Sequence, residues 1–166
     1  FYTSNAGLKP LKVEICEYLK RRCGVTYDPD REVLVSVGGS EAIDMCIRSL
    51  VAPGDEVIIP EPCFVCYQPI TTLTGGVPVP VPLKAENEFR LTAAELKAAI
   101  TPRTKLLVLP FPSNPTGGIM ERQDLEALAQ VLRDTEIMVV SDEIYAELTY
   151  GGERHVSIAS LPGMKE

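Results

Sequence analysis

The sequence predicts an α/β protein in three layers, with a mostly parallel β-sheet between two layers of helices. Segments with apolar residues at helical spacing alternate along the chain with short segments of strand character. These strands are uninterrupted apolar runs, which is typical of a parallel sheet covered on both faces. With 166 residues, 45% of them hydrophobic, the chain is long enough for one globular domain. We expect one domain over 1–166, with no second domain within the chain.

The first half of the chain predicts three helices and three strands. Gly24 ends the first helix, Gly38-Gly39 follows the first strand, and Pro53-Gly54-Asp55 ends the second helix. In chain order the predicted elements are a helix over about 8–23, a strand over 33–37, a helix over 40–50, a strand over 56–59, a helix over about 65–74 and a strand over 77–81.

The second half predicts two helices and two strands. Thr92 stands three residues before Glu95, which is the spacing of a capping box at a helix start. The predicted elements are a helix over about 92–100, a strand over 105–109, a helix over about 121–133 and a strand over 137–140.

Composition and charge exclude several classes of function. The 16 basic and 23 acidic residues give a net charge of −7, so the basic footprint of a nucleic-acid-binding protein is missing. The longest apolar runs, 33–37 and 106–109, are far shorter than the roughly 18 residues of a membrane span. No secretion signal opens the chain, so we expect a cytoplasmic protein that binds neither nucleic acid nor a membrane.

The five cysteines favour reduced thiols over a disulfide framework. Cys63 and Cys66 form a C-x-x-C pair, which zinc sites and thioredoxin-like sites also contain. A zinc site needs a second close pair of ligands, and the single histidine, His155, lies far along the chain. We therefore expect no metal site and interpret these cysteines as buried or incidental thiols.

Three polar motifs follow directly after predicted strands: Gly38-Gly39-Ser40, Asn114-Pro115-Thr116-Gly117 and Asp142-Glu143-Ile144-Tyr145. In open α/β sheets ligands bind outside the carboxyl ends of the strands, so the three loops should converge on one edge. At the first motif, glycines and a helix N-terminus favour a phosphate. At the last, a lasting negative charge on a partly buried Asp142 implies a positive partner.

Each of these residues also has a purely structural alternative. Ser40 is equally typical of a helix N-cap, and Asp142 of a cap on a helix that starts near Ile144. Asn114 fits a turn, while Tyr145 and Phe64 fit a core. Taken together, however, the residues describe a pocket for a phosphorylated aromatic ring with a cationic nitrogen and an oxygen substituent. Pyridoxal 5'-phosphate has that chemistry.

The chain resembles the class I/II aminotransferases, the aspartate aminotransferase-like, fold-type I enzymes that depend on pyridoxal phosphate. The resemblance spans nearly the whole chain, and its motifs match in order and approximate spacing. They are Tyr2-Thr3-Ser4-Asn5-Ala6-Gly7-Leu8, Val37-Gly38-Gly39-Ser40-Glu41-Ala42, Pro53-Gly54-Asp55-Glu56-Val57, Pro62-Cys63-Phe64-Val65-Cys66-Tyr67, Asn114-Pro115-Thr116-Gly117 and Ser141-Asp142-Glu143-Ile144-Tyr145. The resemblance implies that 1–166 is part of the large, cofactor-binding domain.

By position, the resemblance implies a role for each matching residue. Gly38, Gly39 and Ser40 would hold the cofactor phosphate, and Tyr2 would reach the phosphate of the other subunit in a homodimer. The remaining roles concern the ring: Phe64 stacks on it, Asn114 and Tyr145 donate to its oxygen O3′, and Asp142 pairs with its protonated nitrogen so that the ring acts as an electron sink. The peptide bond before Pro115 is often cis in this family.

Parts of the family pattern are not matched in this sequence. The Schiff-base lysine of the family belongs to a Ser-x-x-Lys-like segment beyond the Asp142 motif, and Lys165 does not stand in that context. The family sheet order, 3-2-4-5-6-7-1, implies that the last two strands are absent and that 33–37 lacks its neighbours. Both ends of the chain look like cuts through a larger protein, and we expect the chain alone to be inactive.

The resemblance implies a transfer of an amino group between an amino acid and a 2-oxo acid in the full-length enzyme. A lyase or synthase acting at Cβ or Cγ on the same fold is one alternative. A ligand-sensing domain of a transcription regulator, with a DNA-binding module before Phe1, is another. A piece that binds nothing by itself is the last.

Overall fold

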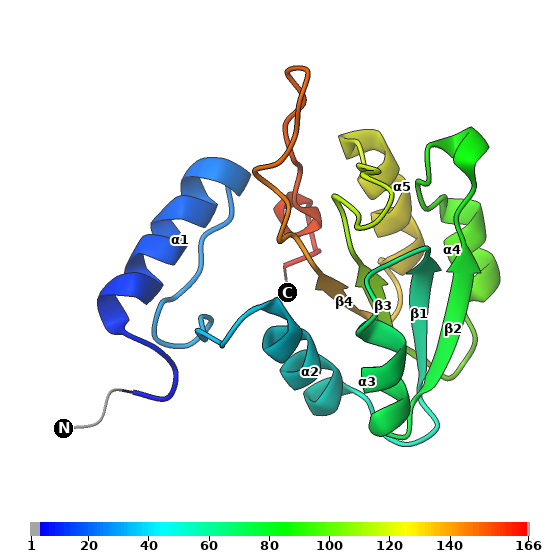
Figure 1. Cartoon of the computed structure of the whole chain (residues 1–166), viewed down its shortest axis with the longest axis horizontal. Coiled ribbons are helices and arrows are strands. Elements are labelled where there is room, and N and C mark those ends of the chain that lie inside the picture. The colour runs from blue at the N-terminus through cyan, green and yellow to red at the C-terminus, as the bar shows by residue number, and fades with distance from the viewer. Residues whose placement is uncertain (1–3, 166) are drawn as a thin grey trace.

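Four parallel strands form the sheet of the structure, a computed structural model that describes residues 4–165. The strands are β1 (Glu56–Glu61), β2 (Val77–Pro82), β3 (Thr104–Leu109) and β4 (Met138–Ser141). They lie in the order β2-β1-β3-β4, and each neighbouring pair is parallel (Figure 1). The α/β class and the parallel sheet predicted from the sequence are confirmed. If the predicted segment over 33–37 is counted as strand 1, then β1 to β4 are strands 2 to 5. The observed order is therefore 3-2-4-5, which is the first part of the order that the resemblance implies.

Helices cover both faces of this sheet, so the predicted three layers are present (Figure 1). The helices are α1 (Lys9–Cys23), α2 (Gly39–Leu50), α3 (Tyr67–Leu73), α4 (Ala93–Ala99) and α5 (Arg122–Leu132), with short 3₁₀ turns at Ala85–Asn87 and Ile158–Ser160. Helices α2 and α3 pack on one face of the sheet, and α4 and α5 pack on the other. Every predicted helix is confirmed, with ends that differ by a few residues. Within residues 4–165 we find no helix that is both long and apolar enough to cross a membrane.

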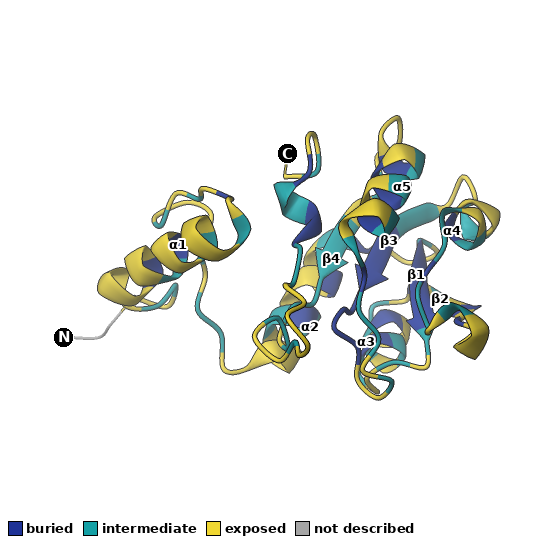
Figure 2. Cartoon of the chain, turned by 90° about the horizontal axis from the view of Figure 1, so that it is seen from above, coloured by how far each residue is buried: buried dark blue, intermediate teal, exposed yellow. Residues whose placement is uncertain are grey.

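The two central strands carry the core, because alternate residues of a strand point to opposite faces. Val57 and Val108 pack against α2 and α3, whereas Ile58 and Leu107 pack against α4 and α5, and all four are fully buried. Figure 2 shows β1 and β3 in the dark blue of buried residues. Burying one such side chain is worth about 1.5–3 kcal/mol, so β1 and β3 hold the layers together.

Strand β2 is an open edge of the sheet, and its prolines face outward. The backbone N–H of Val77 donates to Asp55 (2.8 Å) and that of Leu83 donates to Glu61 (2.7 Å), so the odd-numbered residues bond to β1 and its flanks. The backbone nitrogens of Pro78, Pro80 and Pro82 therefore face the side of β2 that has no partner strand among the described residues. Proline has no N–H to offer there, which protects an edge from pairing with another chain.

The predicted strand over 33–37 is wrong, since residues 33–36 pair with none of the four strands. In the described part of the chain the segment makes one backbone hydrogen bond to a distant residue, from Val35 N to Ala6 O (3.1 Å). Leu34 is 53% exposed and Val37 is 90% exposed. The β-branched composition is suited to a strand, but a strand forms only where a neighbour completes its hydrogen bonds.

The capping box predicted at Thr92 is confirmed. The Thr92 hydroxyl accepts from the backbone N–H of Glu95 (3.2 Å), and the Glu95 carboxylate accepts from the backbone N–H of Thr92 (3.0 Å). The capping box thereby satisfies two of the orphan backbone donors at the start of α4.

Helix α1 lies beside the rest of the molecule and is joined to it by polar contacts (Figures 1 and 2). Neither apolar cluster of the described residues contains a residue of α1. Instead, Arg22 of α1 donates to both carboxylate oxygens of Glu147 (2.7 and 2.8 Å), which also accepts from the Tyr18 hydroxyl. The segment after β4 therefore lies between α1 and the sheet.

Candidate functional site

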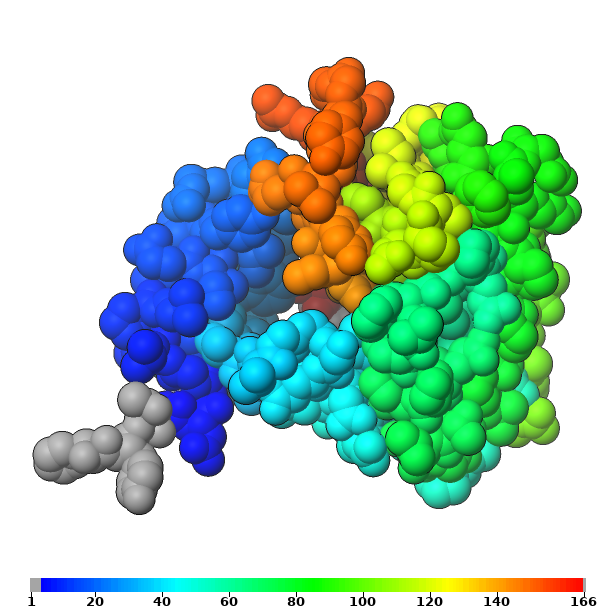
Figure 3. Space-filling view, viewed as in Figure 1, coloured from blue at the N-terminus to red at the C-terminus, as the bar shows by residue number. Residues whose placement is uncertain are grey.

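A cavity of about 160 Å³ lies at the carboxyl ends of β3 and β4, where the sequence motifs converge. It is lined by Gly39, Ser40, Ile43, Phe64, Tyr67, Pro110, Pro112, Asn114, Asp142, Ile144 and Tyr145. The structure thus brings together six of the residues that the sequence singles out: Gly39, Ser40, Phe64, Asn114, Asp142 and Tyr145. Figure 3 shows α2 in cyan, the start of α3 in green and the segment after β4 in orange meeting on one face of the molecule.

The first wall of the cavity is the N-terminus of α2. Gly38 is the N-cap residue with φ = +84°, a conformation that favours glycine, and nothing lies within 4 Å of where its Cβ would be. Ser40 lies within the first turn of the helix, and no side chain caps this end. The alternative interpretation of Ser40 as an N-cap is therefore wrong. Its hydroxyl and the free N–H groups of the first turn are available to an anion.

Asp142 forms the opposite wall, directly after β4, and its two carboxylate oxygens have different partners. Oδ2 accepts from the Tyr67 hydroxyl at 2.8 Å, and Oδ1 accepts from the backbone N–H of Ile144 at 3.2 Å. Residues 144–147 form a turn rather than the helix considered from the sequence. The partly buried Asp142 carboxylate lines the cavity, where it suits a cationic partner.

Tyr67 lines the cavity, although the sequence motif assigned it no role. It is the first residue of α3 and is only 1% exposed. Burial, and then the hydrogen bond to Asp142, raise the pKa of Tyr67, so its hydroxyl remains a proton donor at neutral pH. No signal in the sequence pointed to this role, because the contact of Tyr67 with Asp142 joins residues 75 positions apart in the chain.

Phe64, Asn114 and Tyr145 surround the remaining sides. The ring of Phe64 meets that of Tyr67 edge-on, with centroids 6.4 Å apart at 77°, and Phe64 is 38% exposed. The Asn114 amide nitrogen lies 3.4 Å from the Tyr145 hydroxyl. These two donors are close enough to approach a common acceptor. The peptide bond between Asn114 and Pro115 is cis.

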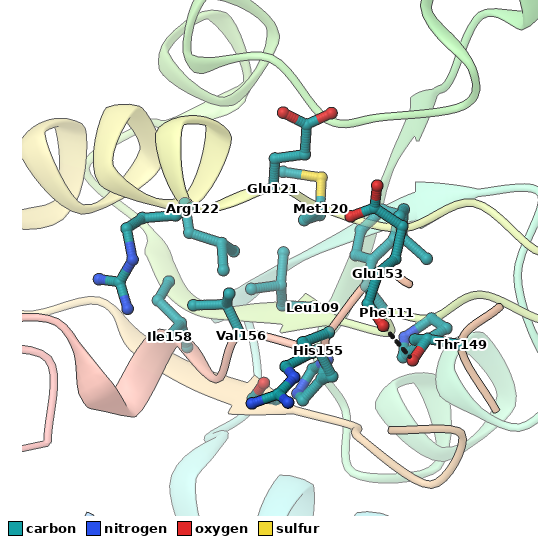
Figure 4. Close-up of a pocket in the computed structure, with 15 residues that line it drawn as sticks. Leu109, Phe111, Met120, Glu121, Arg122, Thr149, Glu153, His155, Val156 and Ile158 are labelled. Carbon is teal, nitrogen blue, oxygen red and sulfur yellow. Dashed lines mark hydrogen bonds between the residues drawn. The ribbon is translucent and has the colours of Figure 1, made fainter. Parts of the chain in front are cut away.

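A second, larger cavity of about 310 Å³ lies on the α5 face of the sheet (Figure 4). Its lining includes the apolar side chains of Leu109, Phe111, Met120, Val156 and Ile158. Apart from Pro112, it shares no residue with the smaller cavity, and the convergent polar motifs all lie at the smaller one. We therefore take the smaller cavity as the candidate site.

The other residues singled out from the sequence lie elsewhere. Gly38 is outside the lining but caps the helix that contributes to it. Tyr2 falls outside the described residues. Lys165 contacts Glu32 (3.2 Å) and lies 5.0 Å from the ring centre of Tyr27, away from the cavity. Burial raises the pKa of the Cys63 thiol to about 11, so this thiol is protonated at neutral pH.

Known proteins of one family match this chain. The profile of the family "Aminotransferase class I and II" matches residues 1–166. The chain is 48% identical over 160 residues to the aspartate aminotransferase of Geobacillus stearothermophilus. This match covers 96% of the chain and 40% of that protein. It is 43% identical over 173 residues to kynurenine–oxoglutarate transaminase 1 of Rattus norvegicus, with 98% and 41% covered.

A solved structure has the same fold. The aromatic aminotransferase from Pyrococcus horikoshii OT3 superposes with a TM-score of 0.95 at 42% identity, over 99% of this chain and 44% of that chain. The chain therefore spans about two fifths of the length of these relatives. It belongs to the family of class I and II aminotransferases.

Proposed function

We propose that this chain is part of a pyridoxal 5'-phosphate-dependent aminotransferase that passes an amino group between an amino acid and a 2-oxo acid. One observation carries the proposal: a helix N-terminus, an aromatic ring, two polar donors and a carboxylate line a single cavity. An anion, a flat ring, a ring oxygen and a ring cation are the four features that such a lining fits. Pyridoxal phosphate carries all four.

The N-terminus of α2 would hold the cofactor phosphate. The free N–H groups of its first turn and the Ser40 hydroxyl are donors, and the positive end of the helix dipole favours an anion. Gly38 lets the chain enter the helix at φ = +84°. The proposed contribution of Tyr2 to a second subunit, and with it a homodimer, stays a prediction of the resemblance, as does a cytoplasmic location.

The ring would lie between Phe64 and the residues at the strand ends. Asp142 would hold a proton on the ring nitrogen, because a carboxylate next to a cation stabilises the charged form. Asn114 and Tyr145 would donate to the ring oxygen, which their separation of 3.4 Å allows. When bound, the cofactor serves as an electron sink for the bonds at the α-carbon of the substrate.

The substrates are proposed only as a class, namely an amino acid and a 2-oxo acid. The relatives are named as an aspartate aminotransferase, a kynurenine–oxoglutarate transaminase and an aromatic aminotransferase. All of them are named as aminotransferases or transaminases, which favours amino transfer over the lyase and sensor alternatives.

Binding of pyridoxal phosphate to the complete protein tests the proposal. Asp142→Ala removes the carboxylate, and the affinity should fall by about 10- to 100-fold, the value of a charge-assisted hydrogen bond. The dissociation constant is measured by titrating the protein and following cofactor absorbance. Asp134→Ala, an exposed aspartate at the far end of α5, is the matched control and should bind like the parent. Equal affinities for Asp142→Ala and the parent would contradict the proposal.

A further inference from the structure

Glu143, the neighbour of Asp142, has a set of contacts of its own on the other side of the turn. Its Oε1 accepts from the Ser141 hydroxyl at 2.8 Å, and its Oε2 lies 2.9 Å from Nε2 of His155. The side chains of Glu143 and His155 are only 19% and 11% exposed. Ser141 and His155 line the larger cavity, where Figure 4 shows His155 near the end of β4. The Asp142 side chain thus lines the smaller cavity, whereas the Glu143 side chain contacts residues that line the larger one.

The surroundings keep Glu143 ionised although it is largely buried. Burial acts to raise the pKa of Glu143, but the contacts with His155 and Ser141 outweigh it, so the pKa lies below its usual value. The negative charge of Glu143 also acts on two residues in the α1 region. Burial, and then this charge, raise the pKa of Cys23 and of Tyr27. Removing one member of a buried pair leaves the other without its partner, which is costly.

The turn after β4 is restrained by its own hydrogen bonds and by side chains on both sides of it. Residues 142 and 143 belong to no helix or strand. The backbone of the turn is tied by the bonds from Asp142 N to Leu109 O (3.1 Å), from Ala146 N to Glu143 O (2.9 Å) and from Leu148 N to Tyr145 O (2.8 Å). Within the turn, the backbone N–H of Ile144 also donates to Oδ1 of Asp142 (3.2 Å). The Tyr67 hydroxyl donates to Asp142 from the α3 side. On the other side Nε2 of His155, in the chain that returns after the loop at 149–154, lies 2.9 Å from the Glu143 carboxylate. The direction of the Asp142 carboxylate therefore depends on anchors on both sides.

We propose that Glu143 and His155 are positioning residues for Asp142. Their contact fixes the turn so that the Asp142 carboxylate faces the smaller cavity at the place where a ring cation would lie. His155 itself does not line that cavity, so it acts only through the turn. The inference rests on the proposed function, because Asp142 matters to the cofactor only if the cofactor binds there.

A double-mutant cycle in the complete protein tests this inference, with the dissociation constant of pyridoxal phosphate as the readout. Glu143→Ala should weaken binding by about three- to tenfold, in the range of couplings between residues in contact. In the Asp142→Ala background the same change should have less than about a twofold effect, because the carboxylate that it positions is gone. A residue with a general structural role would weaken binding equally in both backgrounds, and that result would overturn the inference.

Two further variants sharpen the test. Glu143→Gln keeps an oxygen acceptor for the Ser141 hydroxyl and should retain more affinity than Glu143→Ala. Glu147→Ala is the matched control: it removes a carboxylate four residues later whose partners, Tyr18 and Arg22, belong to α1, and its affinity should equal that of the parent. If Glu143→Ala does not fold, as judged by circular dichroism, His155→Gln enters the same cycle with the same expected non-additivity.

The outcomes separate the inference from the proposed function. If Asp142→Ala leaves the affinity unchanged, the proposed function fails. If Asp142→Ala weakens binding while Glu143→Ala and His155→Gln have no effect, or an additive one, the proposed function stands and only the positioning role fails.

Discussion

The Tyr67 hydroxyl donates to Asp142 at 2.8 Å, although 75 residues separate the two in the chain. Tyr67 comes from the helix layer and Asp142 from the end of a strand, so their contact joins two layers at the candidate site. A hydrogen bond to a carboxylate orients it and limits the directions in which it can face. Tyr67 is therefore part of the site through Asp142.

Removing this hydroxyl tests its contribution. Tyr67→Phe keeps the buried ring and deletes the donor, so the affinity of the complete protein for pyridoxal phosphate should fall by about 2- to 10-fold. The affinity is measured by fluorescence titration. Tyr150→Phe, whose ring is 80% exposed, is the control and should match the parent. An unchanged affinity for Tyr67→Phe would show that Asp142 needs no orientation from α3.

At the level of elements, whether a segment forms its predicted structure depends on where its backbone hydrogen-bond partners lie in the chain. Thr92 and Glu95 start α4 by contacts within four residues, and that start is visible in the sequence. The run over 33–37 has strand composition but no partner strand in the described chain, so it stays irregular. Local patterns therefore predict helices and their ends better than they predict strands, whose hydrogen bonds are all made to other segments.

The edge strand β2 offers a test at this scale. Pro80 is exposed and lies on the unpaired side of β2. Pro80→Val supplies a free N–H on that side and a side chain that favours strands, so the protein should self-associate more readily. Light scattering against protein concentration measures this association. Pro80→Lys also restores the N–H but adds a charge that opposes pairing, and it should stay close to the parent. Equal scattering by all three proteins would contradict the protective role of the prolines.

For the whole molecule, the Glu143–His155 contact makes stability depend on pH. The pKa of Glu143 is lower in the folded protein than its usual value of 4.5, so the unfolded state binds the proton more readily. The contribution of Glu143 is therefore present above about pH 4.5 and is lost as the pH falls through the lower, folded pKa. Urea unfolding of the complete protein between about pH 6 and pH 3.5 should show a falling free energy of unfolding.

The variant Glu143→Gln isolates this group, because it cannot take up the proton. Its free energy of unfolding should fall less steeply over the same range of pH than that of the parent. The same slope in both proteins would mean that Glu143 is not ionised in a favourable contact.

Activity of the chain by itself is a second test at the scale of the molecule. We expect residues 1–166 alone to show no transaminase turnover with any amino acid, because the lysine that moves the proton in the resembling enzymes is not matched in this chain. A coupled assay for the 2-oxo acid product, with the complete protein as positive control, measures it. Turnover by the chain alone would refute this expectation.

The sequence by itself determined the alternation of helices and strands, the layered parallel sheet and six of the residues that line the candidate cavity. It could do so because helical spacing and caps are local, and because the carboxyl ends of parallel strands share one edge. Only the tertiary structure decided that 33–37 stays unpaired, that Tyr67 holds Asp142 and that His155 holds Glu143. These depend on contacts between segments distant in the chain, which no local pattern of residues encodes.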